Sequence, residues 1–143
     1  MSPKISTFIL SHRVAHLATA DERGRPHVIP ICYAYDGEAI YSAIDDKPKR
    51  VSWKGLRRVK NIRVNPQASL VIDDYSEDWS KLAYVMIQGR ASLLTEGPDY
   101  ERAVNLLRDK YPQYRIPPYA LVNPLVIKIK PEGWVAWGGI GSE

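Results

Sequence analysis

Short runs of strand-forming residues, joined by tight turns, occupy the first third of the chain and constrain its fold more than any other feature. The run VAHLATA ends at the polar, glycine-containing segment DERGRP, and the run HVIPICYAY ends at Asp36-Gly37. An Asp-Gly pair between apolar runs is a strong hairpin signal, and the run EAIYSAI follows directly after it. Strands joined by such short turns pair antiparallel, so a three-stranded antiparallel meander is predicted.

The second of these runs, residues 27–35, has apolar residues at both parities. Because successive residues of a strand point to opposite faces, this pattern predicts a strand that is covered on both faces. Three more strands are predicted downstream: NPQASLVIDDY after the turn at Asn65-Pro66, residues 82–94 with Gly89 as a bulge or close-contact point, and residues 125–137 with an interruption at Pro131.

Two amphipathic helices flank these strands. The first begins at Ser2-Pro3, where a hydroxyl cap precedes a proline in the first turn. The second has Pro98 in its first turn and ends at Pro112. Apolar residues at helical spacing predict their buried faces, which are Ile5, Phe8 and Ile9 in the first helix and Tyr100, Ala103, Val104 and Leu107 in the second.

Six strands with few helices predict a mainly β fold, a six-stranded antiparallel barrel with short α-helices. Such a barrel removes exposed sheet edges by closing on itself. The chain has 143 residues, of which 45% are hydrophobic, so it is long enough to bury a substantial core. Since no repeat, low-complexity tract or linker interrupts it, residues 1–143 are predicted to form a single domain.

Composition also limits the class of partner. No apolar run approaches the length that spans a bilayer, so no membrane partner is expected. The N-terminus MSPKISTFILSHR has no small-residue cleavage site, so it is interpreted as a mature start and the chain as cytoplasmic. The lone Cys32 allows neither an internal disulfide nor a cysteine-rich metal site, and no metal site is predicted. The net charge of +4 is compatible with an anionic partner.

The segment DDKPKRVSWKGLRRVKN, residues 45–61, places seven lysines and arginines in seventeen positions. No proline occurs from 51 to 65, so a helix is predicted there. At about 100° per residue, Lys54, Arg57 and Asn61 fall on one side with Arg58 beside them. Guanidinium groups on that side, together with a serine hydroxyl from the end of a nearby strand, form a set of donors suited to one phosphate.

A polynucleotide is the alternative anion for this segment. A single-stranded nucleic acid is usually held by cations interleaved with aromatic rings, on which the bases stack. The aromatic residues of this chain do not interleave with the cations of 45–61 in that way. A nucleic-acid partner is therefore not expected.

The order of these motifs resembles the pyridoxamine 5'-phosphate oxidase-like split barrels. The resemblance covers residues 8–137 and lies in GRPHVIPICYAYDGEAIYSAI, LRRVKNIRVNPQASLVI and VMIQGRASLL. It implies a split β-barrel of the FMN-binding type. It also implies that the flavin phosphate is held by Tyr41 and Ser42 at the end of the third strand and by Arg57 and Arg58 in the helix before Asn-Pro.

Within that family, DDKPKR, LRRVKNI and DDYSEDWSKL resemble the branch assigned to the deazaflavin coenzyme F420. Tyr84 stands where the true phosphate oxidases have a glutamine against the ring, and the C-terminal GWVAW lacks their Arg-x-His pattern. Vitamin B6 oxidation is therefore not expected. Lys47, Lys49 and Arg50 would add charge for an anionic cofactor tail, which suits a polyglutamylated deazaflavin better than FMN.

The resemblance thus implies an oxidoreductase that uses F420 to transfer hydride to an unsaturated small molecule. An FMN-dependent oxidoreductase of the same fold and a non-catalytic carrier of a cofactor or a tetrapyrrole stay open. A homodimer with two cofactor sites between its subunits is implied as well. Trp137, Pro30 and Ile31 would lie against the cofactor ring and Asn61 near its phosphate. No catalytic triad appears, which agrees with chemistry supplied by a cofactor.

Overall fold

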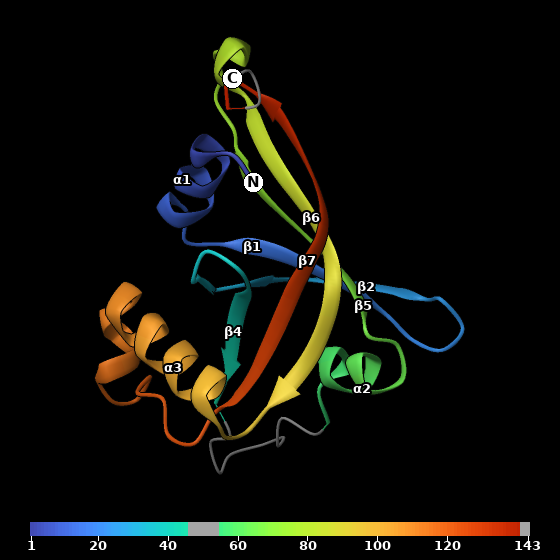
Figure 1. Cartoon of the computed structure of the whole chain (residues 1–143), viewed down its shortest axis with the longest axis vertical. Helices are drawn as coiled ribbons and strands as arrows, with labels where there is room; N and C mark the ends of the chain where they lie inside the picture. The colour runs from blue at the N-terminus through green and yellow to red at the C-terminus, as the bar shows by residue number, and fades with distance from the viewer. Residues whose placement is uncertain (46–54, 141–143) are drawn as a thin grey trace.

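The computed structural model describes residues 1–45 and 55–140 (Figure 1). Within them, three α-helices and two short 3-10 turns accompany one seven-stranded sheet. The helices and turns are α1 (Pro3–Ser11), α2 (Arg57–Val64), α3 (Pro98–Lys110), η2 (Trp79–Lys81) and η3 (Pro112–Arg115). The strands are β1 (Ala15–Ala20), β2 (Pro26–Ile31), β3 (Ala34–Tyr35), β4 (Ile40–Ile44), β5 (Gln67–Asp74), β6 (Ala83–Leu94) and β7 (Leu125–Gly138).

The sheet is antiparallel throughout its described pairings, in the order β2-β1-β5-β6-β7-β4-β3. Its two outermost strands, β2 and β3, are joined by residues 32 and 33 alone, so the sheet must curl until its ends meet. Among the described residues no ladder joins β2 to β3. The fold is therefore the predicted mainly β split barrel, an open curled sheet in place of a fully closed cylinder.

The strand predicted over 27–35 is in fact two strands. Its first part pairs with β1 as β2, and its last two residues pair with β4 as β3. The prediction that this strand is covered on both faces is wrong for β2, since Val28 is 61% exposed. Its alternate residues lie on the convex face of the sheet, and none of the described helices packs over β2 there.

The concave face of the sheet encloses the main hydrophobic core. Both α1 and α2 pack into it, with Ile5, Phe8 and Ile9 from α1 and Val59 and Ile62 from α2. The predicted cap of α1 is confirmed, because the Ser2 hydroxyl accepts a hydrogen bond from the backbone N–H of Ile5. Inward-facing residues of the strands complete this core, among them Leu17, Leu70, Ile72, Val85, Ile87, Ile127 and Ile129.

Helix α3 covers the outer side of the sheet next to β3, β4 and the first part of β7 (Figure 1). Its predicted buried stripe is confirmed, since Tyr100, Ala103, Val104 and Leu107 are all buried there. These side chains pack on Tyr41 and Val126, which point outward from β4 and β7. No helix of the described residues is long and apolar enough to cross a lipid bilayer.

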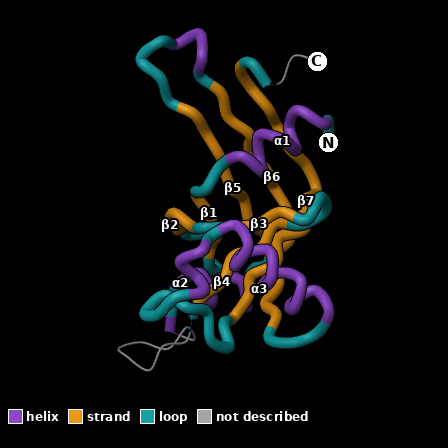
Figure 2. Tube along the Cα trace, turned by 90° about the vertical axis from the view of Figure 1, so that its left-hand side faces the viewer, coloured by secondary structure: helices purple, strands orange, loops and turns teal. Residues whose placement is uncertain are grey.

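The upper halves of β5, β6 and β7 project away from α2 and α3 as a long arm with η2 at its tip (Figure 2). The predicted bulge at Gly89 is confirmed, because Gly89 pairs with Pro131 while Gln88 pairs with Gly133. Glu132 is the extra residue, so β7 continues through Pro131 in place of the predicted interruption. A Cβ on Gly89 would lie 2.2 Å from the carbonyl oxygen of Lys130, which explains the glycine.

Candidate cofactor site

The convex face of the sheet has a continuous band of side chains that runs across five strands. Residues directly opposite in paired strands lie on the same face. The registers place Pro30, His16, Val71, Met86 and Val135 in one row, from β2 through β1, β5 and β6 to β7. The three apolar members from β5 to β7 and the exposed Pro30 flank an exposed imidazole, so this row is a mostly apolar surface with one basic ring.

An aromatic pair lies beside this row, nearer the tip of the arm. Tyr84 of β6 is opposite Trp137 of β7, and their rings stack with centroids 5.8 Å apart and an interplanar angle of 22°. Trp137 is 51% exposed, so part of its ring can contact another planar group. The pair lies on the same convex face as the row. Sequence reasoning placed Trp137 against a ring, and its exposure leaves room for that contact.

A groove of about 550 Å³ lies on the other side of the row. Its floor consists of small residues of β1 and β5, and its sides have amide, guanidinium and carboxylate groups. The bulge in β7 contributes Glu132, and the neighbouring β6 contributes Gln88 and Arg90. The lining residues are Ala18, Thr19, Ala20, Pro26, Asn65, Gln67, Ala68, Ser69, Gln88, Gly89, Arg90 and Glu132.

None of the predicted cofactor residues lines this groove, so sequence reasoning missed it. One signal for it was present in the sequence. Ala18 and Ala20 lie at the same parity of β1, and Ser69 lies opposite Ala18 on β5. Small residues at one parity of two paired strands leave a depression on that face.

The two predicted basic residues of α2, Arg57 and Arg58, differ in their exposure to solvent. Arg57 is exposed at the first position of the helix. Arg58 is half-buried, and its Nε is fully covered and has no hydrogen-bond partner among the described residues. Burial lowers the pKa of Arg58, although Tyr114 opposes this effect. A covered guanidinium N–H without an acceptor costs free energy, and an anion bound there would remove that cost.

Asn61 does not lie on an exposed cationic face. It was predicted beside Arg57, but it is 1% exposed and lies between the buried Val59 and Ile62 of α2. Its Nδ2 donates to the Thr19 hydroxyl at 3.1 Å, and its Oδ1 has no partner. The reason for the difference is that α2 begins at Arg57 and enters the barrel core, so more of its surface is covered than an isolated helix would suggest.

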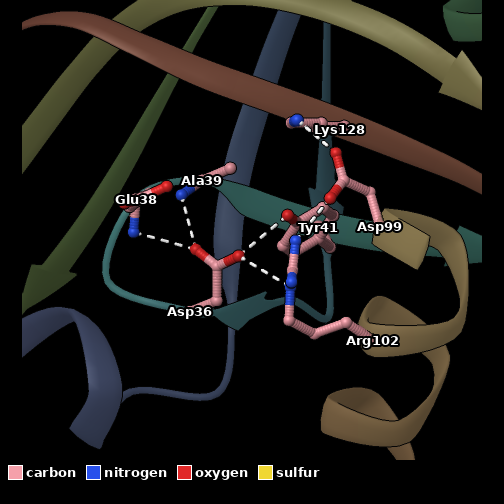
Figure 3. Close-up of polar contacts among 7 residues, drawn as sticks. All are labelled: Asp36, Glu38, Ala39, Tyr41, Asp99, Arg102 and Lys128. Carbon is pink, nitrogen blue, oxygen red and sulfur yellow. Dashed lines mark hydrogen bonds and ion pairs between the residues drawn. The ribbon is translucent and has the colours of Figure 1, made fainter.

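Tyr41 and Ser42, which were predicted to hold the phosphate together, lie on β4 and point to opposite faces of the sheet. Ser42 is 3% exposed on the concave side of β4, whereas Tyr41 is buried under α3 on the convex side. The Tyr41 hydroxyl donates to Asp36 at 2.8 Å (Figure 3). Burial, followed by the hydrogen bond to Asp36, raises the pKa of Tyr41 to about 12. Its hydroxyl thus has a protein partner, and a phosphate contact for this pair stays a prediction.

Asp36 belongs to a polar network that links the β3–β4 hairpin to α3 and β7 (Figure 3). Its carboxylate accepts from the backbone N–H groups of Glu38 and Ala39 and forms an ion pair with Arg102. Arg102 also contacts Asp99, which in turn accepts from Lys128 at 2.6 Å. Each of these groups has a protein partner, so the network fastens α3 to the sheet.

The remaining predicted residues are placed as follows. Pro30 is exposed on the convex band, and Ile31 beside it points into the core. Lys49 and Arg50 lie outside the described residues. Among the residues that the structure does describe, no group of three or more His, Cys, Asp or Glu side chains could hold a metal ion.

Trp137 lies far from Ser42 and from α2 within one chain. Ser42 is opposite Ile127 on β7, and Trp137 follows ten residues later on the same strand. A strand rises about 3.3 Å per residue, so the path along β7 between these positions is roughly 33 Å. In Figure 1, α2 lies at the lower end of the molecule and the end of β7 lies at the far end of the arm. One flavin or deazaflavin cannot contact both with its ring and its phosphate.

Comparison with known proteins identifies relatives of this fold. A family model described as pyridoxamine 5'-phosphate oxidase matches residues 1–138. No curated protein matches the chain in a sequence search. The conserved hypothetical protein Rv2991 from Mycobacterium tuberculosis superposes with a TM-score of 0.76 at 22% identity, covering 96% of this chain and 85% of its own.

Two further solved structures differ in what their names say. HutZ, the heme storage protein from Vibrio cholerae, has a TM-score of 0.75 at 19% identity and covers 96% of both chains. A protein named F420 reductase has a TM-score of 0.66 at 20% identity, covering 91% of this chain and 94% of its own. At such identities these similarities show the shared fold, and they extend over nearly the whole chain.

Proposed function

Because this chain belongs to the pyridoxamine 5'-phosphate oxidase family, we propose that it is an oxidoreductase that uses the deazaflavin coenzyme F420 to transfer hydride to an unsaturated small molecule. The observation that carries this proposal is the half-buried guanidinium of Arg58, whose covered Nε lacks an acceptor. A charge-assisted hydrogen bond to a phosphate oxygen would satisfy that donor. Such a contact contributes roughly 1.5–3 kcal/mol.

The site we propose is built from two copies of the chain. Arg57 and Arg58 of one copy hold the cofactor phosphate, and Trp137 of the other copy lies against the ring. The separation of roughly 33 Å along one strand supports this arrangement, because one chain cannot supply both contacts. The convex band is the surface through which two copies pair, since it is largely apolar and has no helix of the described residues over it.

In this mechanism the protein binds and orients, and the bound deazaflavin supplies the hydride. The basic pair of α2 would hold the phosphate end. Trp137, supported by its stacking on Tyr84, would lie against the ring. The apolar band would exclude water where an unsaturated substrate binds. No side chain of the described residues is assigned as an acid or base.

F420 is preferred to FMN for two reasons that lie in this chain. Tyr84, where the phosphate oxidases have a glutamine, stacks on Trp137 and so presents an aromatic surface to the ring. The chain also has Lys47, Lys49 and Arg50, whose charges suit an anionic polyglutamate tail. The fold similarity to a protein named F420 reductase agrees with this choice.

Heme carriage is the second candidate function. The fold is shared with HutZ, a heme storage protein, and the exposed imidazole of His16 lies in the middle of the convex band. An imidazole within an apolar surface is a common ligand of heme iron. In this alternative His16 would hold the iron, and no hydride transfer would follow.

Equilibrium titration of the purified protein with F420, FMN and heme, side by side, tests the proposal. We expect F420 to bind most tightly. Equal or tighter binding of FMN, or protein that purifies with stoichiometric FMN, would contradict the cofactor assignment. Stoichiometric heme binding that is lost in His16→Ala, with no F420 binding, would support the carrier in its place.

A further inference from the structure

A second pocket, of about 280 Å³, lies between α1, β3 and α3. It shares no residue with the groove or with the residues proposed for the cofactor. Its walls are mostly apolar, and one amine and one carboxylate complete them. The lining residues are Leu10, Ala34, Tyr35, Leu106, Asp109 and Lys110.

The amine of Lys110 has an unusual environment. Its Nζ lies 3.8 Å from the centroid of the Tyr33 ring and 5.5 Å from that of Tyr111. Lys110 forms no ion pair with an acid among the described residues. Asp109, the preceding residue in the sequence, is paired with Arg115 at 2.6 Å. The amine therefore lies over aromatic rings at an apolar pocket, without a counterion.

Burial and one nearby positive charge disfavour the protonated form of this amine. Burial, followed by the nearby guanidinium of Arg13, lowers the pKa of Lys110 from 10.5 to about 8, while Cys32 acts in the opposite direction. Arg13 is held in place because its Nη1 donates to the backbone carbonyl of Lys110 at 2.7 Å. At pH 7 about one amine in ten is then neutral, against roughly one in three thousand for an ordinary lysine. A neutral amine is nucleophilic, and an ammonium is not.

We propose that Lys110 is a carbonyl-capture site, at which its amine forms a reversible imine with a small apolar aldehyde held in this pocket. The amine nitrogen attacks the carbonyl carbon and forms the new carbon–nitrogen bond. The carbonyl oxygen leaves as water with the two amine hydrogens, so no oxidant or reductant is consumed. The apolar walls bind the alkyl or aryl part of the aldehyde, and the rings of Tyr33 and Tyr111 shield the imine from hydrolysis.

Competitive trapping tests this site in the full chain. The protein is treated at pH 7 with limiting hexanal and cyanoborohydride, which reduces an imine to a stable secondary amine, and the modified lysines are located by peptide mass spectrometry. Lys60, exposed on α2, is the internal reference. We expect Lys110 to be modified about tenfold faster or more, given its larger neutral fraction. Modification of Lys110 no faster than Lys60 would overturn the proposal.

Two further experiments distinguish capture of the aldehyde in the pocket from simple reactivity of the amine. Leu10→Gln makes one exposed wall polar, so hexanal trapping at Lys110 should slow severalfold while formaldehyde trapping stays unchanged. An unchanged rate of hexanal trapping would show that the pocket does not bind the aldehyde, and it would overturn the proposal. The trapping rate at Lys110 should also level off above pH 8. A rate at Lys110 that keeps rising up to pH 10 would likewise refute the site. Lys110→Arg confirms the peptide assignment, since it keeps the charge but forms no imine.

Discussion

Arg58 is the residue on which the proposed phosphate contact depends most. A guanidinium is a strong donor that seldom lies half-buried without an acceptor. In this chain its Nε is covered and unpaired, while Arg57 beside it is exposed. The first test of the proposed site therefore belongs at this pair.

Changing Arg57 and Arg58 together to Ala should weaken cofactor binding by roughly 2–5 kcal/mol while leaving the fold intact, because two charge-assisted contacts to the phosphate are lost. Titration of the variant with F420 and with an analogue that lacks the phosphate measures this effect. Binding of the analogue should weaken much less in the variant, since the analogue never made those contacts. Lys60→Ala is the matched control on the same helix, because Lys60 is exposed and has no place in the proposed site.

A nucleic-acid partner would produce a different pattern. Each cation removed, Lys60 included, would then weaken binding to an oligonucleotide by a similar amount and flatten its salt dependence. The same variants are therefore titrated with an oligonucleotide at two salt concentrations. If the double substitution leaves cofactor affinity unchanged, α2 is not the phosphate site.

Asp36 allows a prediction about pH. Burial raises the pKa of Asp36, but hydrogen bonds from Ala39, Glu38 and Tyr41 outweigh it, so the pKa is lowered overall. The pKa of Asp99 is lowered too, chiefly by the hydrogen bond from Lys128. A carboxyl with a lowered pKa binds fewer protons in the folded state, so it stabilises the fold above its unfolded pKa. That stabilisation disappears as the pH falls through the folded value.

The free energy of unfolding should therefore fall as the pH drops below about 4, the usual range of an aspartate, and continue to fall through the lowered pKa values. Asp36→Asn should reduce stability at pH 7 by about 1 kcal/mol and make this acid dependence shallower. Denaturant unfolding between pH 2 and 7 measures both. Glu38→Gln is the control, because the exposed Glu38 contributes only its backbone N–H to the network. An Asp36→Asn variant with the wild-type slope would show that this carboxylate is not linked to folding.

At the scale of elements, the β6–β7 ladder depends on one close approach. Gly89 lies at the bulge, and a Cβ there would lie 2.2 Å from the Lys130 oxygen and 2.9 Å from its carbonyl carbon. Both are backbone atoms, which cannot move aside as a side-chain end can. The bulge also turns Glu132 toward the groove, so the same element shapes the fold and the groove.

Gly89→Ala should destabilise the protein by roughly 1–3 kcal/mol, because the strands must separate locally to accept the methyl group. Gly133→Ala is the matched control on the neighbouring strand, since a Cβ there meets nothing within 4 Å. Thermal and denaturant unfolding of both variants checks this. Equal stability of the two would show that the ladder relaxes without cost.

At the scale of the whole molecule, the proposed site needs a second copy, because Trp137 and α2 lie at opposite ends of one chain. We expect a stable homodimer in sedimentation experiments, with the convex band buried between the copies. A monomer that binds cofactor with full affinity would contradict this expectation.

Mixed dimers give the sharper test. An Arg58→Ala chain paired with a Trp137→Ala chain should have one intact site and one doubly defective site, if each site combines the two copies. The dimer should then bind one cofactor with wild-type affinity. If both residues acted within one chain, each site would have one defect, and no wild-type site would appear in the titration.

The sequence by itself determined the elements that depend on neighbours along the chain. The Ser2 cap, the buried stripe of α3 and the bulge at Gly89 follow from local hydrogen bonding, helical periodicity and steric limits, and all three are confirmed. The antiparallel split barrel follows as well, because short turns leave consecutive strands few other ways to pair. Arg57 and Arg58 were singled out by charge and helical spacing together with the family resemblance, and their phosphate contact stays a prediction.

Only the tertiary structure decided which side chains distant in the sequence would meet. Asn61 was predicted on an exposed face, yet α2 packs into the barrel and buries it beside Thr19. Tyr41 was predicted to contact a phosphate, yet α3 covers it and brings Arg102 to the Asp36 carboxylate that Tyr41 contacts. The groove and the amine of Lys110 likewise arise where separate elements converge. Local periodicity states which face of an element is apolar, but the packing of one element on another decides what that face contacts.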